Sequence, residues 1–148
     1  LVQSVLTEKG MALDFWKIAM RPGKPLMFGE LGPLKVLGLP GNPVSAIVTG
    51  TLFLAPAIRR MLGLARLGPE TVTAKLTGPL PANDFRQDHL RATLSRRDGD
   101  LVATPFATQD SSMLTSLALA DGLIVRLPEA PAAAAGDAVE VLVFDGLC

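Results

Sequence analysis

The sequence predicts an α/β unit over residues 1–66, followed by a small, mostly β unit over residues 67–148. In the first part, apolar runs of strand length alternate with tight turns and lead into one long apolar helix, which is the order of an α/β layer. In the second part, short alternating runs are separated by turn residues, which is typical of a small β-barrel. The change falls within residues 64–69, where we expect a linker.

The composition excludes several classes of protein. Of 148 residues, 49% are apolar and the formal net charge is zero, which argues against disorder and against bulk nucleic-acid binding. The chain has one cysteine, Cys148, and one histidine, His89, so it offers neither a disulfide framework nor a multi-histidine metal site. The longest nearly uncharged stretch, Leu37–Ile58, is interrupted by Pro and Gly, and this favours a buried helix over a membrane span. We therefore expect a cytoplasmic protein.

Four short segments are expected before the long helix. Residues 1–9 carry apolar side chains at helical spacing and are followed by Gly10, which indicates the last turns of a helix. Asp14–Met20 predicts a short strand, and Leu26–Phe28 predicts a second extended piece. Leu34–Leu39 is a mostly apolar run of strand length, which predicts a central strand buried on both faces.

The long helix is predicted from Pro43 to about Leu62. Asn42 is a favourable N-cap, Pro43 suits the first helical position, and Gly63 suits the C-terminal end. Pro56 lies inside this helix and removes one backbone donor, so we expect a kink there.

The second unit is predicted to contain short strands joined by turns. Asp98-Gly99 is a hairpin signal, and residues 109–119 predict a short helical insert. The strands are expected over Glu70–Leu76, Leu90–Arg97, Leu101–Thr104, Gly122–Leu127 and Ala138–Phe144.

Two turns indicate an anion site. Arg21-Pro22-Gly23-Lys24-Pro25 holds two cations three residues apart between prolines, an arrangement that is costly unless an anion lies between them. Pro40-Gly41-Asn42-Pro43 opens directly into the long helix, whose first turn also contains Ser45. The alternative interpretations stay open: a surface loop with ordinary charges, and a well-capped helix without a ligand.

Other polar groups give weaker signals. Asp110-Ser111-Ser112 precedes an apolar pair and is typical of a helix N-cap. Arg86 and Arg91 flank His89 on a predicted strand, where such charges usually form a solvated face or protect an edge. A nucleophile with a matched base is not visible, and the scattered acidic residues indicate no Mg²⁺ site within this chain alone.

Five segments in a fixed order resemble the molybdopterin molybdenumtransferases, which are the bacterial MoeA proteins and their eukaryotic relatives, including the E-domain of gephyrin. The resemblance covers essentially all 148 residues. The matching segments are FWKIAMRPGKP, GLPGNPVSAIVT, FRQDHLRATL, TPFATQDSSMLTSLALADGLIVRLPE and AGDAVEVLVF.

The resemblance implies a fold, a reaction and partners. The chain would be the C-terminal part of a three-layer α/β molybdopterin-binding domain (residues 1–66) followed by a small C-terminal β-barrel domain (residues 67–148). The family inserts molybdate into adenylylated molybdopterin and releases AMP, with a requirement for Mg²⁺. The resemblance also implies that molybdate and molybdopterin are the substrates and that the intact protein is a homodimer.

Residue by residue, the resemblance implies a molybdate pocket. Lys24 matches the second Lys of the family's KPGKP turn. Arg21 matches the first residue of that turn, which is usually Lys in the family. Ser45 matches the Ser of LPGNPVS, while Arg86 and Ser111 match an Arg and a Ser that the barrel turns toward the same cleft. A tetrahedral dianion requires such cations and hydroxyl donors.

The second turn and the catalytic assignment also follow from the resemblance. Pro40, Gly41, Asn42 and Pro43 match the turn that shapes the pterin-phosphate cleft. Arg21 and Lys24 are the expected catalytic residues, which would act by holding the oxyanion and offsetting charge.

The departures from the family predict a fragment that is inactive alone. The GGVSxGxxD loop, with the Asp expected at the Mg²⁺ and phosphate end, should lie just before Leu1 and is absent. The linker-like domains that complete the dimer are absent too. The alternative function is a non-catalytic pterin-binding or scaffolding module. A protein of the adenylylating type is disfavoured, since those proteins resemble the α/β domain only.

Overall fold

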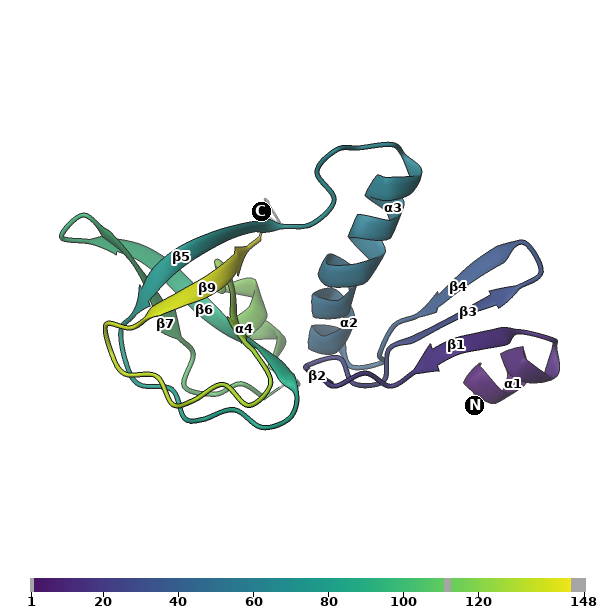
Figure 1. The fold of residues 1–148 in the computed structure, drawn as a ribbon, viewed down its shortest axis with the longest axis horizontal. Coiled ribbons are helices and arrows are strands. Elements are labelled where there is room, and N and C mark those ends of the chain that lie inside the picture. The colour runs from purple at the N-terminus through teal and green to yellow at the C-terminus, as the bar shows by residue number, and fades with distance from the viewer. Residues whose placement is uncertain (1, 111–112, 145–148) are drawn as a thin grey trace.

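The computed structural model describes residues 2–110 and 113–144, and it contains two sheets joined by a long helix (Figure 1). The first sheet is antiparallel, with strand order β1-β3-β4. Its elements are α1 (Val2–Glu8), β1 (Ala12–Trp16), β3 (Met27–Leu31) and β4 (Leu34–Gly38). The predicted N-terminal helix is present, and Gly10 follows it with a φ of 93°.

The predicted long helix forms as three consecutive segments, α2 (Pro43–Thr49), the π-helical η1 (Gly50–Leu54) and α3 (Ala55–Met61). The Asn42 side chain caps α2 by accepting a hydrogen bond from the Ser45 N–H, as predicted. The π-helical segment ends at Leu54, two residues before Pro56, and the Ala55 N–H donates to the Gly50 carbonyl. Because proline clashes with the carbonyl four residues earlier, a wider turn accommodates Pro56.

By length and composition, this 19-residue helix could also cross a membrane. Core helices of soluble proteins meet the same criterion, which makes it weak evidence. Here the α2 half packs into the protein, with Val44 and Val48 fully buried. In α3 none of the side chains is buried, so the prediction of a buried helix holds for α2 only.

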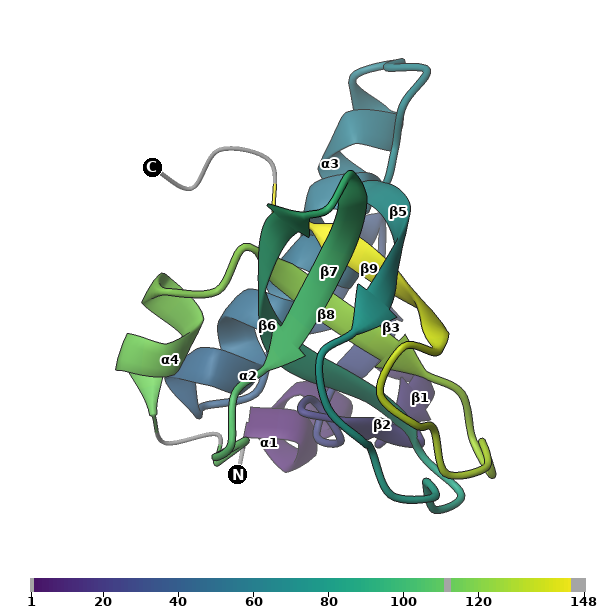
Figure 2. The same cartoon turned by 90° about the vertical axis from the view of Figure 1, so that its left-hand side faces the viewer.

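The second sheet closes into a five-stranded barrel, whose strands are labelled in Figure 2. Strand β6 pairs with both β7 and β8, which completes the circle β6-β7-β5-β9-β8. The strands are β5 (Glu70–Leu76), β6 (Gln87–Arg97), β7 (Asp100–Pro105), β8 (Gly122–Arg126) and β9 (Ala138–Val143). The Asp98-Gly99 turn between β6 and β7 has positive φ at both residues, which is the hairpin geometry that the sequence predicted.

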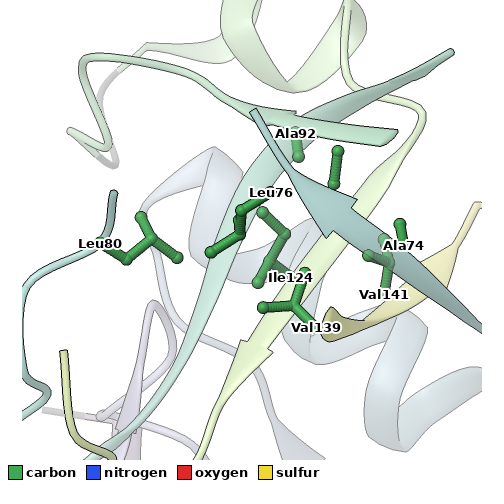
Figure 3. Packing of buried hydrophobic residues seen from close by; sticks show 8 residues of the cluster. Ala74, Leu76, Leu80, Ala92, Ile124, Val139 and Val141 are labelled. Atoms are coloured by element: carbon green, nitrogen blue, oxygen red, sulfur yellow. The ribbon is translucent and has the colours of Figure 1, made fainter. Parts of the chain in front are cut away.

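Small and branched side chains fill the barrel (Figure 3). Because strand residues alternate between faces, every strand sends apolar side chains inward. The buried members are Ala74, Leu76, Leu80, Ala92, Ala103, Ile124, Val139 and Val141. This core explains why the β part of the prediction is correct to within a few residues.

A second apolar cluster joins the helix to the outside of the barrel. Its buried members are Met20, Val44, Val48, Leu117 and Leu123. Leu117 belongs to α4 (Leu114–Ala118), which contacts α2 (Figure 2). Beside the cluster, the two-residue strand β2 (Met20–Arg21) pairs in parallel with the start of β6.

Four predictions for single elements need correction. The strand predicted over Asp14–Met20 is β1, which ends at Trp16 before Lys17 takes a positive φ of 70°, and Met20 begins the separate strand β2. Strand β4 is one arm of an exposed antiparallel hairpin, so Leu34–Leu39 is not a central strand buried on both faces; Leu34 is 61% exposed. Strand β3 runs to Leu31, beyond the predicted extended piece, because the hairpin turn lies at Gly32. The helical insert is confined to α4 instead of spanning 109–119. A three-layer α/β arrangement is not formed by residues 2–110 and 113–144.

Candidate functional site

The first predicted anion-binding turn lies against helix α2. Gly23 has a φ of 126°, which disfavours any other residue there. A Cβ atom on Gly23 would lie 2.6 Å from Thr49 Cγ2 and 2.8 Å from Met20 Cε. The turn from Arg21 to Pro25 is therefore fixed in close contact with the helix and with β2.

The second predicted turn begins the same helix. Pro40 is buried, Asn42 is the cap, and Pro43 is the first helical residue. The Ser45 side chain is 7% exposed, and its backbone N–H donates to Asn42 Oδ1 over 3.3 Å. The Thr49 hydroxyl donates to the Ser45 carbonyl over 2.7 Å. Because Thr49 also contacts Gly23, the two turns lie along one face of α2.

Two of the predicted cations converge on one carboxylate. Arg21 reaches Asp88 through two hydrogen bonds, of 2.9 Å from Nε and 2.8 Å from Nη2. Arg21 Nη2 also lies 3.3 Å from Asp84 Oδ2, and Arg86 Nη2 donates to that same oxygen over 2.6 Å. Arg21 and Arg86, from separate parts of the sequence, thus share a neighbour with opposite charge.

The pKa values reflect this cluster. Hydrogen bonds from the Arg86 side chain, and then from its backbone N–H, lower the pKa of Asp84 to about 2. In turn, the hydrogen bond to Asp84 raises the pKa of Arg86 above its usual value. Both groups are therefore fully ionised near neutral pH, and the four-residue cluster with Arg21 and Asp88 is electrically neutral.

The remaining predicted site residues have different surroundings. Lys24 is exposed on its turn, and its ammonium group forms no ion pair with residues 2–110 or 113–144. Gly41 is exposed at the tip of the second turn. Ser111 lies outside the described residues. The structure thus brings Arg21 and Arg86 together, with Lys24 and Ser45 on the adjoining turns.

A cavity of about 700 Å³ adjoins the arginine–aspartate cluster. Arg21 and Asp88 line it, together with the loop before β6 and the segment after β7. His89 also faces it and is 4% exposed. Burial lowers the pKa of His89 to about 4, so the ring is neutral near pH 7. Among the described residues, His89 Nδ1 has no hydrogen-bond partner.

The sequence prediction missed a buried arginine that shapes this cavity. Arg91 is 2% exposed, and its guanidinium donates to the carbonyls of Asp110 (3.0 Å) and Met113 (3.1 Å). Gln109 binds the backbone of Arg91 reciprocally, with one hydrogen bond of 3.0 Å in each direction. Arg91 therefore fixes the segment that follows β7.

The prediction of a solvated face around His89 is wrong. Asp88, His89 and Arg91 are all buried, and Asp88 lies opposite the buried Arg126 in the β6–β8 register. Arg126 donates to the carbonyls of Pro81 and Pro131 and so stabilises the position of the loop before β6. In the sequence, these residues are marked only by a run of charged side chains, and such a run does not distinguish a solvated surface from a polar interior.

The described residues do not fit a Mg²⁺ ion. They contain no group of three His, Cys, Asp or Glu side chains that could hold a metal. The two carboxylates beside the cavity, Asp84 and Asp88, are engaged by arginines. No step of a reaction is therefore assigned to a metal held by these residues.

Comparisons with known proteins agree on one family. Residues 73–144 match the family model described as the MoeA C-terminal region (domain IV). The chain is 36% identical to the molybdenum cofactor synthesis protein cinnamon of Drosophila melanogaster, over 97% of the chain and 25% of that protein. It is 32% identical to the molybdopterin molybdenumtransferase of Haemophilus influenzae, over 95% of the chain and 35% of that enzyme.

A solved structure shows the same arrangement over nearly the whole chain. The molybdopterin biosynthesis MoeA protein of Pyrococcus horikoshii superposes with a TM-score of 0.79 and 31% identity, covering 99% of the chain and 35% of that protein. The chain thus spans about a quarter to a third of the length of these relatives.

Proposed function

The chain belongs to the MoeA family of molybdenum cofactor biosynthesis, and we propose that it acts as the C-terminal part of a molybdopterin molybdenumtransferase. In the intact protein, molybdate is inserted into adenylylated molybdopterin and AMP is released. The names and shared segments of the relatives support this assignment.

We propose that residues 1–66 complete a three-layer α/β domain together with further segments of a longer protein, and that residues 67–148 form the barrel domain. Large apolar side chains support this proposal, because they are exposed on β1 and α3. They include Phe15 (39%), Trp16 (47%), Ile58 (47%) and Met61 (86%). Exposed apolar side chains of this size are typical of surfaces that another segment covers.

The proposed molybdate site consists of Arg21, Lys24, Ser45, Arg86 and Ser111, with the turn from Pro40 to Pro43 beside the pterin phosphate. The observation that carries it is the convergence of Arg21 and Arg86 beside Asp84; Gly23, between Arg21 and Lys24, packs closely against Thr49 of α2. Fixed cations stabilise a tetrahedral dianion and offset charge as oxide ligands leave. Lys24, exposed and not in an ion pair with the described residues, is the cation most accessible to an entering anion.

Replacing Lys24 tests this site. We expect Lys24→Ala to raise the Kd for molybdate about tenfold in equilibrium dialysis of the 148-residue chain, because a cation in contact with a dianion is lost. Lys9→Ala removes the same charge at the exposed end of α1 and should leave the Kd unchanged. Equal Kd values for both variants would contradict the proposed role of Lys24. A chain that binds no molybdate would favour the non-catalytic module.

Three further features of the intact protein are proposed on family membership alone. Mg²⁺ would be held by segments outside this chain, since the described residues do not fit it. The intact protein would be a homodimer. It would work in the cytoplasm.

A further inference from the structure

We propose that the carboxylate of Asp84 competes with the substrate anion for the guanidinium groups of Arg21 and Arg86. This competition weakens the binding of dianions at the site. This inference rests on the proposed function, because it concerns the same oxyanion site. It assigns to Asp84 a role in determining which anions bind and how tightly.

The contacts of Asp84 are those expected of a bound anion. Its Oδ2 atom accepts from Arg86 Nη2 over 2.6 Å and lies 3.3 Å from Arg21 Nη2. Arg86 Nε is 3.3 Å from both carboxylate oxygens. A carboxylate and an oxyanion present similar acceptor oxygens to a guanidinium group, so both would use the same donors.

The backbone holds Asp84 in this position. Its Oδ1 atom accepts the Arg86 backbone N–H over 2.8 Å, and its own carbonyl accepts the Glu129 N–H over 2.8 Å. The carboxylate is therefore placed between the arginines by the loop before β6, even though its side chain is 39% exposed.

Asp88 has a different role. Its side chain is 10% exposed and makes the two shorter bonds to Arg21, next to the β2–β6 pairing. This buried pair fixes Arg21 in place. Asp84 is the more accessible of the two carboxylates, so an anion from solvent would compete with Asp84 and leave Asp88 in contact with Arg21.

The competition depends on charge. An anion beside Arg21 and Arg86 also lies beside the negative charge of Asp84, and the repulsion doubles when the anion carries two charges. Removing the charge of Asp84 should therefore favour molybdate over perrhenate, which is a tetrahedral monoanion of similar size. Loss of a purely steric obstacle would favour both anions equally.

Asp84→Asn is the test. Asparagine retains an oxygen that can accept the Arg86 N–H, so the loop keeps its hydrogen bond while the charge is removed. We expect the Kd for molybdate, measured by equilibrium dialysis with the 148-residue chain, to fall about tenfold, and the Kd for perrhenate about threefold. Asp98→Asn removes the same charge at the exposed β6–β7 turn and should change neither value.

The outcomes separate this inference from the proposed function. If the wild-type chain binds molybdate and Asp84→Asn binds it no more tightly, the inference is overturned while the oxyanion site stands. Equal gains for the two anions would also overturn the role assigned to charge. If the wild-type chain and Asp84→Asn both fail to bind molybdate, the proposed site itself is wrong, and the inference falls with it.

Discussion

Replacing the buried Arg91 by methionine should destabilise the protein strongly. Its guanidinium makes two well-formed hydrogen bonds, to the carbonyls of Asp110 and Met113, and a longer one of 3.3 Å to Gln109 Oε1. Hydrogen bonds from a charged donor contribute about 1.5–3 kcal/mol each, and the methionine variant loses these bonds. Burial lowers the pKa of Arg91, which shows that the cation itself is costly to bury and offsets part of the gain.

The expected loss in Arg91→Met is therefore about 3 kcal/mol of unfolding free energy, once this offset is included. Urea unfolding followed by circular dichroism measures it, and Arg97→Met at the exposed end of β6 is the matched control. Arg91→Lys should recover less than half of the loss, because an ammonium group cannot span the separated carbonyls. If Arg91→Met and Arg97→Met are equally stable, the hydrogen bonds from Arg91 to the carbonyls of Asp110 and Met113 do not stabilise the protein, and this explanation is refuted.

Two further predictions concern the barrel. Gly122→Ala should lower the unfolding free energy by more than about 2 kcal/mol, because the new Cβ would lie 2.5 Å from the Leu142 carbonyl oxygen across the β8–β9 pairing. The control Gly78→Ala has open space around its Cβ and should have little effect in the same thermal unfolding experiment. The unfolding free energy should also fall, by up to about 3 kcal/mol, as the pH decreases from 7 toward 4.5. The reason is that the pKa of His89 is near 6.5 in the unfolded chain but about 4 in the folded protein, so the unfolded state takes up its proton first. His89→Phe should remove most of this slope; a slope equal to that of the wild type would show that other groups cause it.

The barrel could be predicted from the sequence because its signals are local. Alternating apolar residues and the Asp98-Gly99 turn fix the strand faces and one hairpin, and the structure confirms both. The cap of the long helix was predictable for the same reason: Asn42, followed by Pro43, satisfies backbone donors nearby in the sequence.

The errors arise where the outcome depends on distant parts of the chain. The apolar run from Leu34 to Leu39 has the composition of a buried strand, but its exposure depends on which layers lie beside it. Arg91 carries the same charge as a solvated arginine, and only the fold places three backbone carbonyls around it. Asp84 and Asp88 were missed because their importance comes from Arg21, which lies more than sixty residues away.

The geometry of the proposed site depends on one short strand pairing. Met20 pairs with Gln87 and Arg21 with Asp88, so the same two-residue ladder sets the turn with Lys24 and the start of β6. Arg86 immediately precedes that ladder, which places both arginines relative to each other through backbone hydrogen bonds. The apolar cluster of Met20, Val44 and Val48 holds the ladder against α2. The contact between helix and barrel is therefore part of the site, because it fixes the turn that begins α2 relative to Arg86.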